Sequence, residues 1–338
     1  MPAWDLLRNI WFLLIGILLA GYAVLDGFDL GVGTLLPFLA KNEDEKRTLI
    51  GAVGPVWDGN EVWLLAGGGA LFAAFPMAYA TVFSGFYLAL MIALFALILR
   101  AVSLEFRAHD PSRKKLWEAA FVGGSFLPAL LFGVALGNVV AGVPLDARTE
   151  FAGSFFTLLR PLPLVFGLLG LCAFLMHGAA YASLKCEGAL RQRAQKAGRV
   201  LAVAFGAAFV LSFVMVRIYL PGALGSIPAW IFAAIVVLSL VLAAAGLKKG
   251  RDGRAFFFSS TAFLGLWGIV GSIQYPVLVR ATDPALSLTI RNASSSALTL
   301  KVMLIVALVG MPLVVFYTIF AFRVFKGRVR PGGADAGY

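Results

Sequence analysis

Long apolar runs alternate with short polar segments along the whole chain. A membrane-spanning helix needs about 20 predominantly apolar residues. Nine runs have that character, with the second and third joined by a tight turn near Pro76: 9–38, 54–76, 78–104, 116–139, 161–184, 199–220, 226–247, 254–274 and 299–323. No gap between them exceeds about 30 residues, which leaves no room for a separate water-soluble domain. The pattern predicts an all-α, polytopic membrane protein with nine transmembrane helices.

Composition supports this interpretation. The chain is 61% hydrophobic and 13% charged, whereas a soluble domain carries about 25% charged residues. The first apolar run continues well past residue 20 and has a weakly charged start, so we expect an uncleaved first span rather than a signal peptide. We expect a single integral membrane domain over 1–330, followed by a polar tail over 331–338.

The basic residues are distributed unevenly between the two sides of the predicted membrane. Of the 28 Lys and Arg, 21 fall on one side, in the tail and in the segments 39–53, 100–116, 184–199 and 248–254. Cytoplasmic loops carry the excess of Lys and Arg. The N terminus is therefore predicted outside and the C terminus in the cytoplasm. This orientation explains the net charge of +11, so we do not expect a nucleic-acid partner.

A short internal echo suggests how the helices are grouped. "AVLDGFDLG" in the first run is similar to "FLMHGAAYA" in the fifth, with Asp26-Gly27 matching His177-Gly178. Two four-helix bundles, over about 9–139 and 161–274, plus one peripheral helix over about 299–323 fit this echo.

The segment "GYAVLDGFDLGVG" places two acids inside the first apolar run. Asp26 and Asp29 are three residues apart, so they share one helix face. Asp29 lies nine residues before the inner end of the run, a depth of about 13 Å at 1.5 Å per residue. A charge at the membrane centre costs roughly 2.5–3.5 kcal/mol. This face must therefore meet protein, a cation or water rather than lipid.

Further charges are expected at the cytoplasmic side of the next two spans. "GPVWDGNEVW" opens the second span with Asp58 and Glu61, and Arg100 lies about one turn from the inner end of the third. With the two acids of the first span, four carboxylates and one arginine are predicted to converge. Intramembrane acids of this kind mark proton or ion pathways.

Structural explanations remain open for each of these charges. Asp58 follows Pro55, a favourable first residue of a helix, and an acid in the first turn is stabilised by the helix dipole. Arg100 could extend to the membrane interface. Asp26 and Asp29 have no helix terminus nearby, so their alternatives are a structural salt bridge or a proton or cation site.

Residues that hold redox cofactors are scarce. The chain has two histidines, His109 in a cytoplasmic loop and His177 in the fifth span, and two cysteines, Cys172 and Cys186. A bis-histidine haem needs two ligands in the membrane, and the cysteines form neither a disulfide framework nor a metal motif. We therefore expect this chain to bind no cofactor and to catalyse no redox reaction alone.

Several long strings resemble one known family. They are "GYAVLDGFDLGVG", "PVWDGNEVWLLAGGGALFAAFPMAYATVFSGFYLAL", "GSFLPALLFGVALGNVVAGVP" and "SSSALTLKVM". The chain resembles subunit II of the cytochrome bd-type quinol oxidases, and the resemblance is dense over 1–145 and near 290–320.

The resemblance implies a multi-pass protein of the bacterial inner membrane that pairs with subunit I. Subunit I would carry two b-type haems, one d-type haem and the quinol-oxidising loop, and a small single-span accessory subunit occurs in some complexes. Together the subunits oxidise quinol and reduce oxygen to water in aerobic respiration, contributing to the membrane potential with protons taken from the cytoplasm. In some members, subunit II holds a quinone.

By position, the resemblance also implies roles for individual residues. Asp26, Asp29, Asp58 and Arg100 would belong to the proton or cation pathway, to which the pattern of charges adds Glu61, and Asp29 and Asp58 would be candidate cation ligands. Trp57 and Asn60 flank Asp58 and would support it.

Two rival functions remain. An ion- or proton-coupled transporter could use the same acids, but it would need inverted repeats and broken helices, whereas the echo is parallel. A purely structural scaffold for a haem-bearing subunit would not need the acids at all.

Overall fold

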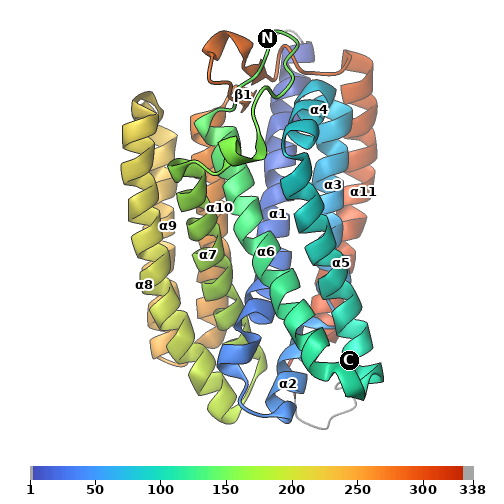
Figure 1. Ribbon diagram of the computed structural model, residues 1–338, viewed down its shortest axis with the longest axis vertical. Coiled ribbons are helices and arrows are strands. Elements are labelled where there is room, and N and C mark those ends of the chain that lie inside the picture. The colour runs from blue at the N-terminus through green and yellow to red at the C-terminus, as the bar shows by residue number, and fades with distance from the viewer. Residues whose placement is uncertain (1–2, 330–338) are drawn as a thin grey trace.

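The computed structural model of the chain describes residues 3–329, and the predicted tail over 331–338 lies outside the described residues. The described chain is a bundle of long helices (Figure 1). Eight of them are long and apolar enough to cross a membrane: α1 (Ala3–Leu39), α5 (Tyr87–His109), α6 (Lys114–Ala141), α7 (Pro161–Lys185), α8 (Gly188–Tyr219), α9 (Ile227–Lys248), α10 (Asp252–Gln274) and α11 (Ala297–Val324). The chain is therefore an all-helical, polytopic membrane protein.

The predicted second and third spans are divided differently from expectation. α3 (Trp57–Ala74) ends before Pro76, which starts the short helix α4 (Pro76–Gly85), and α5 begins only at Tyr87. A continuous span over 78–104 is thus wrong at its start. Proline has no N–H group and favours the first turn of a helix, so it begins a new helix here. With its polar first turn, α3 is not among the eight apolar helices, and nine crossings stay a prediction.

One end of the bundle, called here the lower end, is closed by α2 (Glu43–Val53) (Figure 1). This segment was expected to be a loop. The Asn42 side chain accepts a hydrogen bond from the Glu45 amide and caps the helix, and the last six residues of α2 are buried. The Tyr181 hydroxyl on α7 donates to the Ala52 carbonyl at 2.9 Å. α2 is therefore an integral part of the core.

The opposite end, called the upper end, carries the start of α1 and the small extramembrane elements (Figure 1). β1 (Val277–Val279) pairs antiparallel with β2 (Leu288–Thr289). Short 3₁₀ turns complete the connections at this end, namely η2 (Phe155–Leu158), η3 (Pro221–Gly225) and η4 (Pro284–Leu286), while η1 (Pro111–Arg113) joins α5 to α6 at the lower end.

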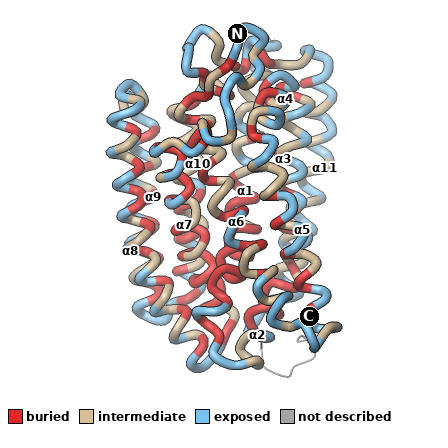
Figure 2. Tube along the Cα trace, viewed as in Figure 1, coloured by how far each residue is buried: buried red, intermediate tan, exposed pale blue. Residues whose placement is uncertain are grey.

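α1 is the central helix and packs against α3, α6, α7 and α10. Figure 2 shows buried residues along α1, α6 and α7, whereas α11 is mostly exposed. Only Leu300 of α11 is buried. The division into two four-helix bundles stays a prediction, because α1 and α6 also pack against α7 in the second predicted bundle. Both α1 and α11 begin at the upper end of the bundle (Figure 1).

Candidate functional site

Arg100 lies at the centre of a buried cluster of charges in the lower half of the bundle. Its Nη2 is 2.6 Å from Oδ1 of Asp26, and its Nη1 is 3.1 Å from Oδ2 of the same carboxylate. The side chains of Arg100 and Asp26 are 1% and 0% exposed. The guanidinium fork and the carboxylate match in this bidentate geometry, so α1 and α5 are joined by a fully desolvated ion pair.

The same arginine also contacts α3. Its Nη2 lies 3.0 Å from Oε1 of Glu61, although this contact lacks the alignment of a hydrogen bond. The Glu61 side chain is 23% exposed, and Asp58, one turn earlier on α3, is exposed. Burial therefore increases in the order Asp58, Glu61 and the Arg100–Asp26 pair.

Asp29 has a different partner. Its Oδ2 accepts a hydrogen bond of 2.7 Å from Nδ2 of Asn60 on α3. Its Oδ1 is buried and has no hydrogen-bond partner within residues 3–329. The two acids of α1 share one face, as predicted, but Arg100 pairs with Asp26 while Asn60 holds Asp29.

The predicted convergence is thus partly correct. Asp26, Asp29 and Glu61 lie in contact with Arg100 or Asn60, whereas Asp58 points to the surface. Arg100 also lies farther from its helix end than the one turn expected, because α5 continues to His109.

Two aromatic residues near the cluster were missed from the sequence. The hydroxyl of Tyr22 and Nε1 of Trp63 are both buried, and the Tyr22 hydroxyl lies near the Asp26 carboxylate. Both residues belong to one apolar cluster of α1 and α3. Tyr22, Asp26 and Asp29 follow i, i+4, i+7 spacing, which places Tyr22 on the acidic face of α1. That spacing could have revealed it.

The candidate cation site at Asp29 and Asp58 gains no support from the geometry. Asp29 is buried beside Asn60, and Asp58 is exposed. Within residues 3–329, no group of three or more His, Cys, Asp and Glu is placed to hold a metal ion. Trp57, expected to support Asp58, instead packs against the apolar core at the lower end.

His177 is buried and uses both ring nitrogens. Nε2 donates to the Val24 carbonyl at 2.9 Å, which leaves Nδ1 of a neutral ring to accept from the Ser259 hydroxyl at 2.6 Å. The ring stacks on Phe256 with 4.8 Å between centroids. Neither nitrogen is free for an iron, so the residue does not fit a haem ligand.

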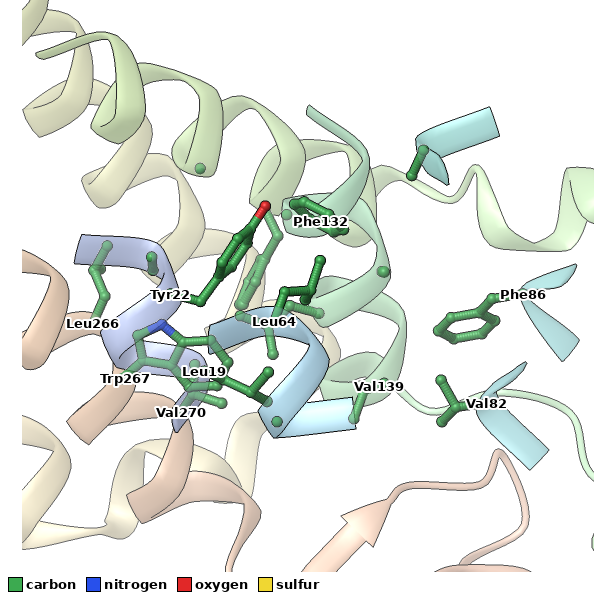
Figure 3. A pocket seen from close by; sticks show the side chains of 18 of the residues that line it. Leu19, Tyr22, Leu64, Val82, Phe86, Phe132, Val139, Leu266, Trp267 and Val270 are labelled. Atoms are coloured by element: carbon green, nitrogen blue, oxygen red, sulfur yellow. The ribbon is translucent and has the colours of Figure 1, made fainter. Parts of the chain in front are cut away.

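Above the charged cluster lies an apolar cavity of about 780 Å³. Side chains from α1, α3, α6 and α10 point into it, including Leu19, Leu64, Phe132 and Trp267 (Figure 3). Tyr22 also lines this wall (Figure 3), and its spacing places it on the same face of α1 as Asp26 and Asp29. The cavity and the charged cluster are therefore adjacent.

Comparisons with known proteins agree over almost the whole chain. The family model described as cytochrome bd terminal oxidase subunit II matches residues 7–325. A probable cytochrome oxidase subunit 2 of Haemophilus influenzae is 37% identical over 97% of each chain. Cytochrome bd-I ubiquinol oxidase subunit 2 of Escherichia coli K12 is 36% identical over 97% of each chain.

Two further relatives extend this comparison. Cytochrome bd ubiquinol oxidase subunit 2 of Bacillus subtilis is 36% identical, over 96% of this chain and 97% of its own. A chain in the structure of bd oxidase from Geobacillus thermodenitrificans superposes with a TM-score of 0.80 at 19% identity, over 94% of this chain and 98% of that chain. The superposition shows that the two chains share a fold.

Proposed function

The chain belongs to the cytochrome bd terminal oxidase subunit II family, and from this premise we propose that it conducts protons or cations from the cytoplasm toward a haem-bearing subunit I. In that complex, quinol is oxidised and oxygen is reduced to water. The chain contributes stability and the polar pathway, and it is not catalytic alone.

The graded burial of the charged cluster carries this proposal. Asp58 is at the surface, Glu61 is partly buried, and Asp26 is fully buried against Arg100. Carboxylates can take up and release protons, while the fixed charge of Arg100 stabilises an ionised acid in a medium that would otherwise disfavour it. The unpartnered Oδ1 of Asp29 can accept a hydrogen bond from a buried water molecule.

The distribution of basic residues supports the direction of transfer. The segments with the excess of Lys and Arg join the helices at the lower end, where α2 and the start of α3 lie. The positive-inside rule places that end in the cytoplasm and the start of α1 outside. Asp58 would then be the entry group.

The exposed apolar surface of α3 supports docking of subunit I. Val62, Leu65 and Phe72 are 47%, 74% and 58% exposed. Val62 and Leu65 follow Asp58 by four and seven residues, so the three share one helix face. α11 packs beside α3, and most of its residues are exposed. Subunit I bound on this surface would cover Asp58 and could accept a proton from the Asp58 carboxyl group.

The cofactors of the complex are expected in subunit I: two b-type haems and one d-type haem, which supply the electron transfer and oxygen chemistry. His177 of this chain does not fit as a ligand, because both of its ring nitrogens are engaged. The apolar cavity has the size and lining suited to a quinone with an apolar tail, with the Tyr22 hydroxyl as the polar contact.

Conservative acid substitutions in the assembled complex test the pathway. Asp26→Asn, Asp58→Asn and Glu61→Gln keep the shape of each side chain and remove its charge. We expect at least one of them to slow quinol-driven oxygen consumption by about tenfold or more, since a positioned proton donor contributes at least this much. Glu105→Gln, an exposed carboxylate on α5, is the matched control.

Haem absorption measured on the same samples separates loss of proton delivery from loss of cofactor. Full oxygen consumption and full proton uptake in all three variants would refute the pathway and leave the scaffold alternative. The transporter alternative is tested by purification in mild detergent. An oxidase subunit co-purifies with a haem-bearing polypeptide and is inert without it, whereas a transporter works alone.

A further inference from the structure

Two partly buried arginines at the upper end have no acidic partner. Arg160 precedes α7, and Arg280 follows β1. In the described chain, neither guanidinium lies within 4.0 Å of an Asp or Glu oxygen, whereas Arg8 at the same end pairs with Asp5 at 3.0 Å. Both side chains are only partly exposed. Two positive charges are therefore held close to the membrane boundary without neutralisation.

Main-chain carbonyls position both side chains. Nη2 of Arg160 donates to the carbonyl of Gly142, the residue that ends α6. Nη2 of Arg280 donates to the Ile273 carbonyl in the last turn of α10 at 3.2 Å. A cation at a helix C terminus is favourable, and this accounts for one nitrogen of each guanidinium.

The remaining donors are not accounted for. Nε of Arg160 and Nε of Arg280 are buried and have no hydrogen-bond partner within residues 3–329. A guanidinium has five N–H donors and no acceptor; Nη1 of neither arginine forms a hydrogen bond in the described chain, so this nitrogen can donate to an acceptor that reaches the exposed part of the group. Burial lowers the pKa of both groups because it penalises the charged form. Both sites would gain from an anion.

The two side chains meet the same short segment. Gly142 has a φ of +92°, and a Cβ built on it would lie 3.4 Å from Cγ of Arg280. Its carbonyl is the acceptor for Arg160. Next along the chain, the Val143 amide donates to the Arg280 carbonyl at 2.9 Å. One segment at the end of α6 thus holds both arginines in a common neighbourhood.

The surface beside Arg160 is suited to a hydrocarbon chain. Leu164 and Leu168 on α7 are each 44% exposed, and they follow Arg160 by one and two helical turns on the same face. A charged group at the start of a membrane helix, followed by exposed leucines along it, matches the polarity of a phospholipid from headgroup to acyl chain.

We propose that Arg160 and Arg280 form a binding site for the phosphate of an anionic phospholipid, whose acyl chain lies along Leu164 and Leu168 of α7. The guanidiniums donate to the phosphate oxygens in the charge-assisted geometry that arginine favours. The lipid supplies the charge that the chain lacks here and binds at the joint between α6, α7 and α10.

Native mass spectrometry of the whole complex, reconstituted with phosphatidylglycerol and phosphatidylcholine in equal amounts, tests the site. We expect the wild-type complex to retain phosphatidylglycerol selectively, and Arg160→Gln/Arg280→Gln to retain at least about tenfold less of it, since two charge-assisted contacts are lost. Arg217→Gln is the control, because this arginine is exposed at the upper end of α8 and should leave retention unchanged.

Equal phosphatidylglycerol retention in the wild type and the double variant would overturn the proposal, as would an equal loss in Arg217→Gln. Inorganic phosphate is added in a separate arm, and full displacement of the lipid by it would overturn the assignment to a lipid. Should the double variant fail to assemble, Arg160→Lys/Arg280→Lys keeps both charges. Selective retention by that variant supports the site, and loss of selectivity counts against it.

Discussion

At the scale of single residues, the ion pair with Arg100 compensates the charge of Asp26 inside the bundle. A buried ion pair contributes little net stability, because the desolvation of both charges offsets their attraction. Removing one partner is different, since it leaves an uncompensated charge in an apolar medium. Asp26 and Arg100 are both almost wholly buried. Each therefore depends on the other.

Arg100→Gln should destabilise the assembled complex by about 3–5 kcal/mol, the cost of breaking a buried pair. Asp26→Asn/Arg100→Gln should recover much of this loss, because neither charge remains. The thermal unfolding of the complex in detergent measures both. Arg100→Lys keeps the charge but loses the bidentate geometry, so the stability of this variant should lie between those of the wild type and Arg100→Gln. Equal destabilisation of the single and double variants would contradict the interdependence.

At the scale of helices, α1 and α7 cross at glycines. A Cβ on Gly178 would lie 2.4 Å from the carbonyl carbon of Gly31, and one on Gly31 would lie 2.1 Å from the Phe174 carbonyl oxygen. Small residues allow such close backbone approach in membrane helices. The contact holds the helix of the two buried acids against the second half of the chain.

Gly178→Ala should force α1 and α7 apart and cost about 1–3 kcal/mol or more, because backbone atoms cannot yield as a flexible side chain can. Gly123→Ala on α6 is the matched control, since nothing lies within 4 Å of its added Cβ. The yield and unfolding temperature of the complex should fall for the first variant only. Equal effects would mean that helix flexibility, rather than the crossing, matters.

α2 is tied to the lower ends of the membrane helices by ion pairs. Glu45 on α2 pairs with Arg193 on α8, and Nε of that arginine donates to the Leu39 carbonyl at 2.8 Å, capping α1. Burial raises the pKa of Glu45, but the Lys41 amide and the Arg193 guanidinium outweigh it, so the pKa lies below its ordinary 4.5.

A lowered pKa means that the Glu45 contribution is complete above pH 4.5 and is lost as the pH falls through the folded-state value. Glu45→Gln should therefore be less stable than the wild type at pH 7, by a few tenths to about 1 kcal/mol for a pair of this exposure. Unfolding temperatures measured at a series of pH values should converge below pH 4.5. A difference that is constant with pH would rule out this electrostatic origin.

At the scale of the whole molecule, the charged cluster and the apolar cavity lie at different positions along the bundle axis. The charged cluster lies in the lower half, the apolar cavity lies above it, and Tyr22 belongs to both. Figure 2 shows that the surface of α11 is largely exposed from end to end. We propose that subunit I docks on this apolar surface, next to the exposed Asp58 on α3.

Val62→Trp should therefore hinder assembly, because a larger side chain does not fit a packed interface. Leu238→Trp on α9 should be tolerated, since a large apolar side chain can face lipid. Val62 and Leu238 are 47% and 59% exposed in the isolated chain, so the two variants are not distinguished by the exposure of the substituted residue. The amount of haem-bearing partner that co-purifies measures the effect. Equal co-purification would place the interface elsewhere.

Much of the fold followed from hydropathy alone. The apolar runs predicted the eight long helices, because a helix that crosses a membrane needs an apolar surface whatever its neighbours are. The break between α3 and α4 coincides with Pro76, as the predicted turn required. The separate short helix α4, which delays the start of α5 to Tyr87, was not predicted. α2 was missed because its mean polarity is that of a loop, while its burial depends on Tyr181 from a distant helix.

The sequence by itself determined that this chain is a membrane protein and that acids lie inside its spans. It also determined which family its motifs resemble. Each of these depends on local composition or on the order of residues. Tertiary structure alone decided that Asp26 pairs with Arg100, that Asn60 holds Asp29, and that Asp58 stays at the surface. The physical reason is that pairing depends on the rotation and height of each helix against its neighbours, and those are set by packing among residues far apart in the chain.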